Sequence, residues 1–149
     1  MTNRTRPITR SELMSRIRSK DTKPELVIRR GLHARGLRFR LHRRDLPGTP
    51  DLVLRRSGVV VEVRGCFWHG HENCARQPKS RQEFWGPKLA RNRERDAQNL
   101  QSLHDLGWRV VIVWECTMVG CGRWDREELL GEVETFIHST ERFREIAGH

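Results

Sequence analysis

The stretch PDLVLRRSGVVVEVR, residues 50 to 64, holds two short apolar runs on either side of the four-residue connection Arg55 to Gly58. Runs of this length that are rich in valine favour strands, and a short connection that contains glycine is typical of a β-hairpin. Apolar residues occupy both faces of the two runs. We therefore expect two central strands that helices cover on both sides.

Outward from the hairpin, the chain shows the periodicities of alternating helices and strands. Thr22 and Glu25 form a capping box that opens a helix, and Gly36 can end it. The further expected elements are a strand over 37–42, a helix over 87–106, a strand over 108–115, a helix over 125–138 and a polar tail over 141–149.

The segment between the apolar runs 59–63 and 108–114 is long enough for a crossover helix. Strands joined in this way run parallel, and we expect these two to be neighbours. Their carboxyl ends then lie at one edge of the sheet. The element order predicts an α/β fold with a central mixed β-sheet flanked by helices.

The charge balance indicates a polyanionic partner. Lys and Arg outnumber Asp and Glu by 29 to 19, which gives a net charge of +10, and such a surface suits nucleic acid. The 149 residues correspond to one domain, expected over 11–140 between a basic N-terminal arm, 1–10, and the polar tail. The arm would either contact phosphates or remain a solvated tail.

No targeting or membrane-spanning segment is expected. No apolar run approaches the roughly 20 residues that span a bilayer, and the basic N-terminus lacks the apolar core of a secretory signal. We place the protein in the cytoplasm, where Cys66, Cys74, Cys116 and Cys121 stay reduced. A metal site is then favoured over disulfides.

Two carboxylates are expected to face each other across the hairpin. Reflection through the centre of its connection sets Asp51 opposite Glu62, about 5 Å away at the Cβ atoms, with Arg64 on the same face. Two such carboxylates can hold Mg²⁺. Alternatively, Asp51 caps a turn and Glu62 pairs with Arg64 on the surface. The valines around Glu62 favour function, because an uncompensated charge there is costly.

Soft metal ligands gather in the segment GCFWHGHENC, residues 65 to 74, and after the strand 108–115. Cys66, His71 and Cys74 share one loop, and Cys116 follows the neighbouring parallel strand. One nitrogen and three sulfur ligands would close a tetrahedral structural Zn²⁺ site. Cys121 is a possible substitute for Cys116. Buried cysteines that serve only as small apolar residues are the alternative.

His69 lies in the same loop, seven residues beyond Glu62, and has no assigned ligand role. A neutral histidine near the expected Mg²⁺ can take a proton from water. We expect a carboxylate to orient its other ring nitrogen, with Asp96 on the long helix as the candidate. The alternative role for His69 is that of a zinc ligand.

Seven segments stand in an order that resembles one family. They are KDTKPE (20–25), GLRFRLH (36–42), LPGTPDLV (46–53), GCFWHGH (65–71), EFW (83–85), NRERD (92–96) and GWRVVIVWEC (107–116). The chain resembles the very-short-patch-repair, or Vsr, endonucleases of the PD-(D/E)xK superfamily. The resemblance covers residues 11 to about 120. It implies a restriction-endonuclease-like fold with a structural zinc.

The resemblance also implies an activity. Such enzymes nick DNA on the 5′ side of the thymine in a T:G mismatch left by deamination of 5-methylcytosine. The implied partners are the mismatched duplex and mismatch-repair proteins, and the implied location is the bacterial cytoplasm, at the nucleoid. A single nick needs one active site, so we expect a monomer. The alternatives are a nuclease of this fold without mismatch preference and an inactive, zinc-stabilised DNA-binding protein.

Residue roles follow from the same resemblance. Asp51 and the backbone carbonyl of Val63 would bind Mg²⁺, His69 would take part in proton transfer, and Glu25 would support the site. Phe67, Trp68 and Trp85 would match aromatic residues that wedge into the base stack, with Lys88 and Asn92 as further DNA contacts. Phe67 and Trp68 could instead be core residues.

The segment VEVRG departs from the family pattern at two positions. The Glu62 position is commonly apolar in the family, and the Arg64 position is commonly His or Asp. Arginine cannot act as a general base, because its pKa lies above about 12. We therefore expect Arg64 to stabilise phosphate charge, His69 to carry proton transfer alone, and Glu62 to add a metal ligand.

Overall fold

The computed structural model describes residues 22–71, 74 and 81–149. The expected basic arm, 1–10, lies outside this part of the chain. Described residues form a five-stranded mixed sheet in the order β1-β2-β3-β4-β5. The strands are β1 (Arg40–Leu41), β2 (Leu52–Leu54), β3 (Val59–Arg64), β4 (Arg109–Trp114) and β5 (Phe143–Ile146). The predicted α/β fold is confirmed.

The hairpin has the predicted register. Leu52 pairs with Val61 and Leu54 with Val59 in the antiparallel β2–β3 ladder, so the same register continued by one residue sets Asp51 across from Glu62. Strands β3 and β4 are parallel neighbours, as the crossover rule predicts. The carboxyl ends of β3 and β4 therefore meet at one edge of the sheet.

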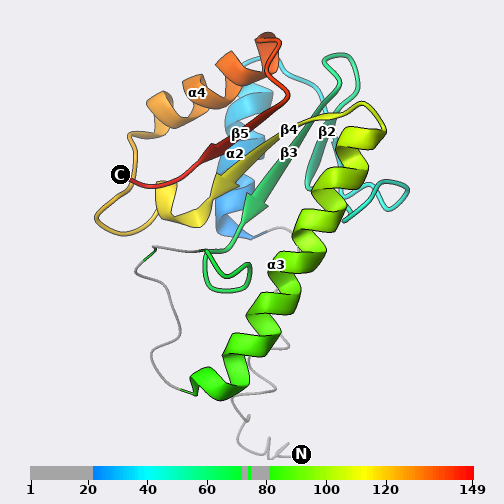
Figure 1. Ribbon diagram of the computed structural model, residues 1–149. Coiled ribbons are helices and arrows are strands. Elements are labelled where there is room, and N and C mark those ends of the chain that lie inside the picture. The colour runs from blue at the N-terminus through cyan, green and yellow to red at the C-terminus, as the bar shows by residue number, and fades with distance from the viewer. Residues whose placement is uncertain (1–21, 72–73, 75–80) are drawn as a thin grey trace, which may run out of the picture.

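Helices cover both faces of the sheet (Figure 1). On one face, α2 (Lys23–Ala34) and α4 (Arg126–His138) pack on an apolar core that includes Ile28 and Phe136. On the other face, the C-terminal half of α3 (Gln82–Asp105) packs Leu103 against a second core. The N-terminal half of α3 extends beyond the sheet. Among the helices described, none combines the length and apolar composition that a bilayer-crossing segment requires.

Helix boundaries agree with the sequence where a capping residue marks them. The Thr22 side chain caps the N–H of Glu25 at 3.4 Å, and the Asp125 side chain caps the first turn of α4. The long helix differs, because α3 begins at Gln82, five residues before the expected start at Pro87. The strand expected over 37–42 is also shorter, since only Arg40 and Leu41 pair with β2.

The expectation of a polar tail over 141–149 is wrong for its middle part. Phe143–Ile146 forms β5, which pairs in parallel with β4. Ile146 is 3% exposed and joins the core beneath α2 and α4, whereas Phe143, on the opposite face, is 38% exposed. Two apolar residues three apart on an edge strand do not give the alternation that identifies a strand in a sequence.

Candidate active site

A small pocket of about 140 Å³ lies beside the hairpin, on the face that α3 covers. Asp51 and Glu62 line it from neighbouring strands, and His69 and Asp96 line it from the loop after β3 and from α3. The complete lining is Gly48, Thr49, Pro50, Asp51, Glu62, Val63, Arg64, His69, Asp96 and Asn99. The structure thus brings five expected catalytic residues to one pocket, namely Asp51, Glu62, Arg64, His69 and Asp96.

Asp51 is the most electrostatically perturbed group of this pocket. The backbone N–H of Val63 donates a hydrogen bond to its Oδ2 at 2.8 Å. The pKa of Asp51 is raised to about 8, chiefly by burial and in smaller part by the neighbouring carboxylates of Glu25 and Glu62, while the Val63 N–H opposes the rise. A bound cation would favour the ionised carboxylate, so this environment suits a metal ligand.

The raised pKa of Asp51 predicts a pH-dependent stability without Mg²⁺. The folded protein binds this proton more tightly than the unfolded chain, whose Asp has a pKa near 3.8, so stability falls as the pH rises from about 4 to about 8. Asp51→Asn lacks the titrating group, so we expect its free energy of unfolding to fall less steeply with pH than that of the wild type, by up to about 1.4 kcal/mol per pH unit. Urea unfolding of the wild type and of Asp51→Asn at pH 5, 6.5 and 8 in Mg²⁺-free buffer measures this difference. The same pH dependence in the two proteins would contradict a raised pKa at Asp51.

Glu62 and Arg64 form a buried ion pair, not the surface pair of the alternative interpretation. Arg64 Nη2 lies 2.7 Å from Glu62 Oε2, and both side chains are 11% exposed. The Arg64 guanidinium also lies 5.8 Å from the centroid of the Trp114 ring. Because each charge compensates the other, the pair can remain beside the pocket in the absence of substrate.

His69 makes the hydrogen bond that was expected from the sequence. Its Nδ1 lies 2.6 Å from Asp96 Oδ2. Two further side chains of α3 hold the same loop, because Asn92 donates to the carbonyl of Trp68 at 2.9 Å and Arg93 donates to that of Gly70 at 3.3 Å. The long helix therefore fixes both the position of the loop and the orientation of its histidine.

The ligand cluster predicted for zinc is assembled. One ligand atom from each of Cys66, His71, Cys74 and Cys116 lies within 4.8 Å of the others, and three sulfurs with one imidazole are a fitting donor set for tetrahedral Zn²⁺. Burial raises the pKa of the Cys66 thiol, and Cys116 adds to the rise. Burial lowers the pKa of His71, which favours the neutral form that metals bind. Exposed Cys121 is not part of the cluster.

The two alternative cysteines give a matched pair of variants. We expect Cys116→Ser to lose bound zinc and to lower the melting temperature by several degrees, because a structural metal contributes directly to folding. Cys121→Ser should leave both unchanged. Metal content after gel filtration, with thermal unfolding of both variants, measures this. Equal zinc content in the two variants would exclude Cys116 as a ligand.

The C-terminus packs against this cluster. The backbone N–H of Gly148 donates to the sulfur of Cys116 at 3.2 Å, and that of His149 donates to the carbonyl of Gly122 at 2.8 Å. A Cβ at position 148 would lie 2.5 Å from the carbonyl oxygen of Cys116, so only glycine fits there. Amide donors to a thiolate are outer-shell partners of the kind that orient metal ligands.

Four aromatic rings gather where the loop meets the start of α3. Trp85 lies at their centre, with its ring centroid 5.0 Å from that of Phe67, 5.9 Å from that of Trp68 and 5.0 Å from that of Phe84. Trp85 is only 7% exposed, whereas Phe84 is 53% exposed. The Lys88 ammonium lies over three of these rings, those of Trp68, Phe84 and Trp85. Phe84 was not singled out in the sequence, although it directly precedes Trp85.

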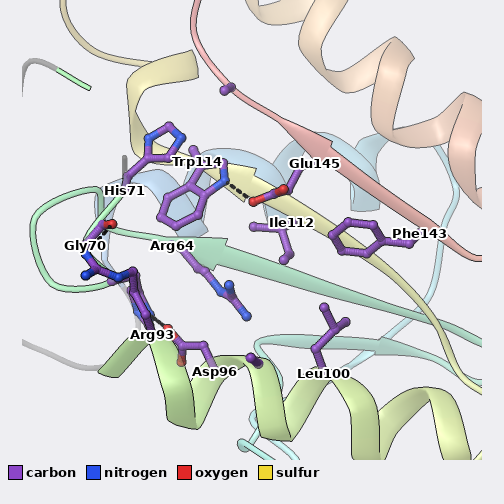
Figure 2. A pocket seen from close by; sticks show the side chains of 13 residues that line it. Arg64, Gly70, His71, Arg93, Asp96, Leu100, Ile112, Trp114, Phe143 and Glu145 are labelled. Atoms are coloured by element: carbon purple, nitrogen blue, oxygen red, sulfur yellow. Dashed lines mark hydrogen bonds and ion pairs between the residues drawn. The ribbon is translucent and has the colours of Figure 1, made fainter. Parts of the chain in front are cut away.

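A larger cavity of about 410 Å³ adjoins the pocket, between α3 and strands β4 and β5 (Figure 2). Arg64, His69 and Asp96 line both spaces. Trp114 closes one wall, and its indole N–H donates to Glu145 at 2.9 Å. The cavity therefore leaves open space beside His69, on the side away from Asp51.

One residue near the pocket, His42, was missed in the sequence, whereas Glu25 was expected to support the site. Glu25, which is 2% exposed, approaches the Asp51 side chain from α2 and contributes to its raised pKa. The Nε2 of His42 lies 2.9 Å from Glu25 Oε1. The segment LRFRLH was interpreted as a strand and as part of the family resemblance, and neither interpretation gave a role to the single histidine at its end.

Comparisons with known proteins agree with this geometry. Residues 2–76 match the family model described as DNA mismatch endonuclease Vsr. The Type II nicking enzyme V.XorIIP of Xanthomonas oryzae pv. oryzae is 49% identical over 123 residues, which are 82% of this chain and 90% of that protein. The DNA mismatch endonuclease Vsr of Escherichia coli is 40% identical over 131 residues, 87% of this chain and 83% of that protein. The chain therefore belongs to the Vsr family of DNA mismatch endonucleases.

Proposed function

We propose that the protein is a Mg²⁺-dependent endonuclease that nicks DNA on the 5′ side of the thymine in T:G mismatches. The observation that carries this proposal is the single pocket lined by two opposed carboxylates and by the hydrogen-bonded pair of His69 and Asp96. The two relatives described above are named as a mismatch endonuclease and a nicking enzyme. As in those bacterial relatives, we infer that it acts in the cytoplasm, where chromosomal DNA lies.

Three groups would hold the metal ion. Asp51 and the carbonyl of Val63 come from neighbouring strands, and Glu62 adds a second carboxylate from the position opposite Asp51. When bound, Mg²⁺ supplies a Lewis acid that stabilises negative charge on the phosphate. Glu25 supports Asp51 from α2.

His69 is the proton acceptor in this proposal. Asp96 accepts the Nδ1–H hydrogen bond and so fixes the tautomer in which Nε2 carries the lone pair. Nε2 can then take a proton from the attacking water. Arg64 lies in the same pocket, paired with Glu62, and its guanidinium would stabilise charge on the phosphate.

The aromatic cluster would contact the mismatched pair. Inserting apolar rings between base steps costs a few kcal/mol, and the cost is least at a mismatch. Phe67 and Trp68 are partly exposed, while the buried Trp85 supports them from below. Lys88 would contact a phosphate from α3, and Asn92 holds the loop through the Trp68 carbonyl.

Strand-labelled duplexes test the proposal. Duplexes that carry T:G, T:A or C:G at one position are incubated with Mg²⁺ or with a chelator, and the cut site is read at nucleotide resolution. We expect one nick, 5′ of the mismatched thymine, at a rate at least about tenfold above that on T:A. Equal cleavage of all duplexes would indicate a general nuclease. Binding without any cleavage in Mg²⁺ would indicate an inactive DNA-binding protein.

A further inference from the structure

A second set of possible metal ligands meets at Asp51. Glu25 projects from α2, His42 follows β1, and Asp51 precedes β2. One ligand atom of each lies within 4.8 Å of the other two. Atoms that bind one metal ion at about 2.0–2.2 Å lie no more than about 4.4 Å apart, so small side-chain movements would bring all three to a common ion.

Partners outside the cluster already orient its members. The N–H of Val63 holds one oxygen of Asp51, and Arg29 Nη1 lies 3.2 Å from Glu25 Oε2. Glu25 presents its other oxygen to His42 Nε2 at 2.9 Å. The backbone N–H of His42 also donates to the carbonyl of Asp51 at 3.1 Å. Such outer hydrogen bonds fix ligand geometry in protein metal sites.

We propose that Glu25, His42 and Asp51 form a second metal site, which binds a borderline divalent cation such as Mn²⁺, Co²⁺ or Zn²⁺ in preference to Mg²⁺. An imidazole nitrogen with two carboxylates suits these ions, whereas Mg²⁺ prefers oxygen ligands and water. Glu25 and Asp51 bring two carboxylates close together, and a bound cation would relieve the repulsion between them. Three protein ligands leave positions open for water or phosphate.

The site differs in chemistry from the cysteine cluster and from the hairpin pocket. It contains no sulfur, so Co²⁺ bound there lacks the intense thiolate absorption that Co²⁺ gives in a cysteine site. It shares Asp51 with the proposed Mg²⁺ site but not Glu62. His42→Gln and Glu62→Gln therefore separate the two oxygen-rich sites, since each variant alters one of them.

Mn²⁺ binding in the absence of DNA tests this inference, with protein prepared with one equivalent of zinc so that the cysteine cluster is filled and the second site is left open. We expect electron paramagnetic resonance to show one tightly bound Mn²⁺ with spin-echo modulation from a directly coordinated nitrogen. His42→Gln should abolish that modulation and weaken binding about tenfold or more. Glu62→Gln should retain the modulation, as should His138→Gln, which alters an exposed histidine of α4.

Two results would overturn the site. They are bound Mn²⁺ without nitrogen modulation in the wild-type protein, and unchanged modulation and affinity in His42→Gln. Zinc content and the melting temperature of His42→Gln show whether that variant is folded. If that variant is not folded, a Mg²⁺ titration of the Mn²⁺-bound wild-type protein decides. Loss of the nitrogen-coupled signal at equal concentrations of the two ions contradicts the proposed preference. Because no nicking is measured, this result and that of the duplex assay are independent.

Discussion

Replacing Asp51 with Asn is expected to slow nicking of a T:G duplex by about 10³-fold or more. The substitution keeps the size of the side chain and can still accept the Val63 N–H, but it removes the negative charge that would hold Mg²⁺. Losing several kcal/mol of charge stabilisation at the phosphate corresponds to a factor of this size. Single-turnover nicking with saturating enzyme measures the rate of the chemical step directly.

Asp45→Asn is the matched control for this experiment. Asp45 carries the same charge, but its side chain is 59% exposed and pairs with Arg43 at the surface. We expect its nicking rate to stay within about twofold of wild type. Gel-shift binding of Asp51→Asn to the mismatched duplex should also survive. Nicking at a normal rate by Asp51→Asn would show that the catalytic metal, if any, lies elsewhere.

His69→Ala is expected to lower the nicking rate by about 10²- to 10⁴-fold, the usual contribution of a general base. Added imidazole should restore part of the activity, because the vacated space opens to the cavity beside His69. His138→Ala, on the exposed side of α4, is the control. A merely structural role for His69 would show as lost stability without rescue by imidazole.

Asp96→Asn separates orientation of His69 from its chemistry. The asparagine amide can still lie beside Nδ1 of His69, but it can turn its NH₂ group to the place where the carboxylate oxygen accepts the hydrogen bond. The histidine tautomer is then no longer fixed. We expect a smaller loss than for His69→Ala and no rescue by imidazole. A loss equal to that of His69→Ala would mean that the two residues act as one unit.

The parts of the fold that could be predicted obey local rules. A four-residue connection with glycine at its end fixes which residues of the hairpin face each other, and so places Asp51 opposite Glu62. A crossover helix between β3 and β4 makes those strands parallel and brings Cys66 near Cys116. Two sites could therefore be predicted before any contact was known.

The start of α3 could not be predicted because its signal is absent. Arg81 occupies the capping position with φ of 55° and no side-chain hydrogen bond to the helix, whereas most helices open with a capping oxygen. Pro87 favours the first turn of a helix, but here it lies within α3. The aromatic cluster around Trp85 joins this first stretch of α3 to the loop that carries His69.

Long-range contacts account for the remaining misses. His42 belongs to its cluster only because α2 and β2 converge there, and its side chain contacts a residue 17 positions away. The edge strand β5 depends on pairing with β4. Its charged residues also contact other elements, as when Glu145 accepts a hydrogen bond from the Trp114 indole. Neither relation leaves a periodic pattern in the sequence.

The contact between Gly148 and Cys116 links the edge of the sheet to the cysteine cluster. The Gly148 N–H donates to the Cys116 sulfur at 3.2 Å, and Ile146, two residues earlier, is held in the core by β5. Loosening the edge strand would therefore also shift the amide that supports Cys116. Substitutions on β5 can weaken the cysteine cluster without touching any of its four ligands.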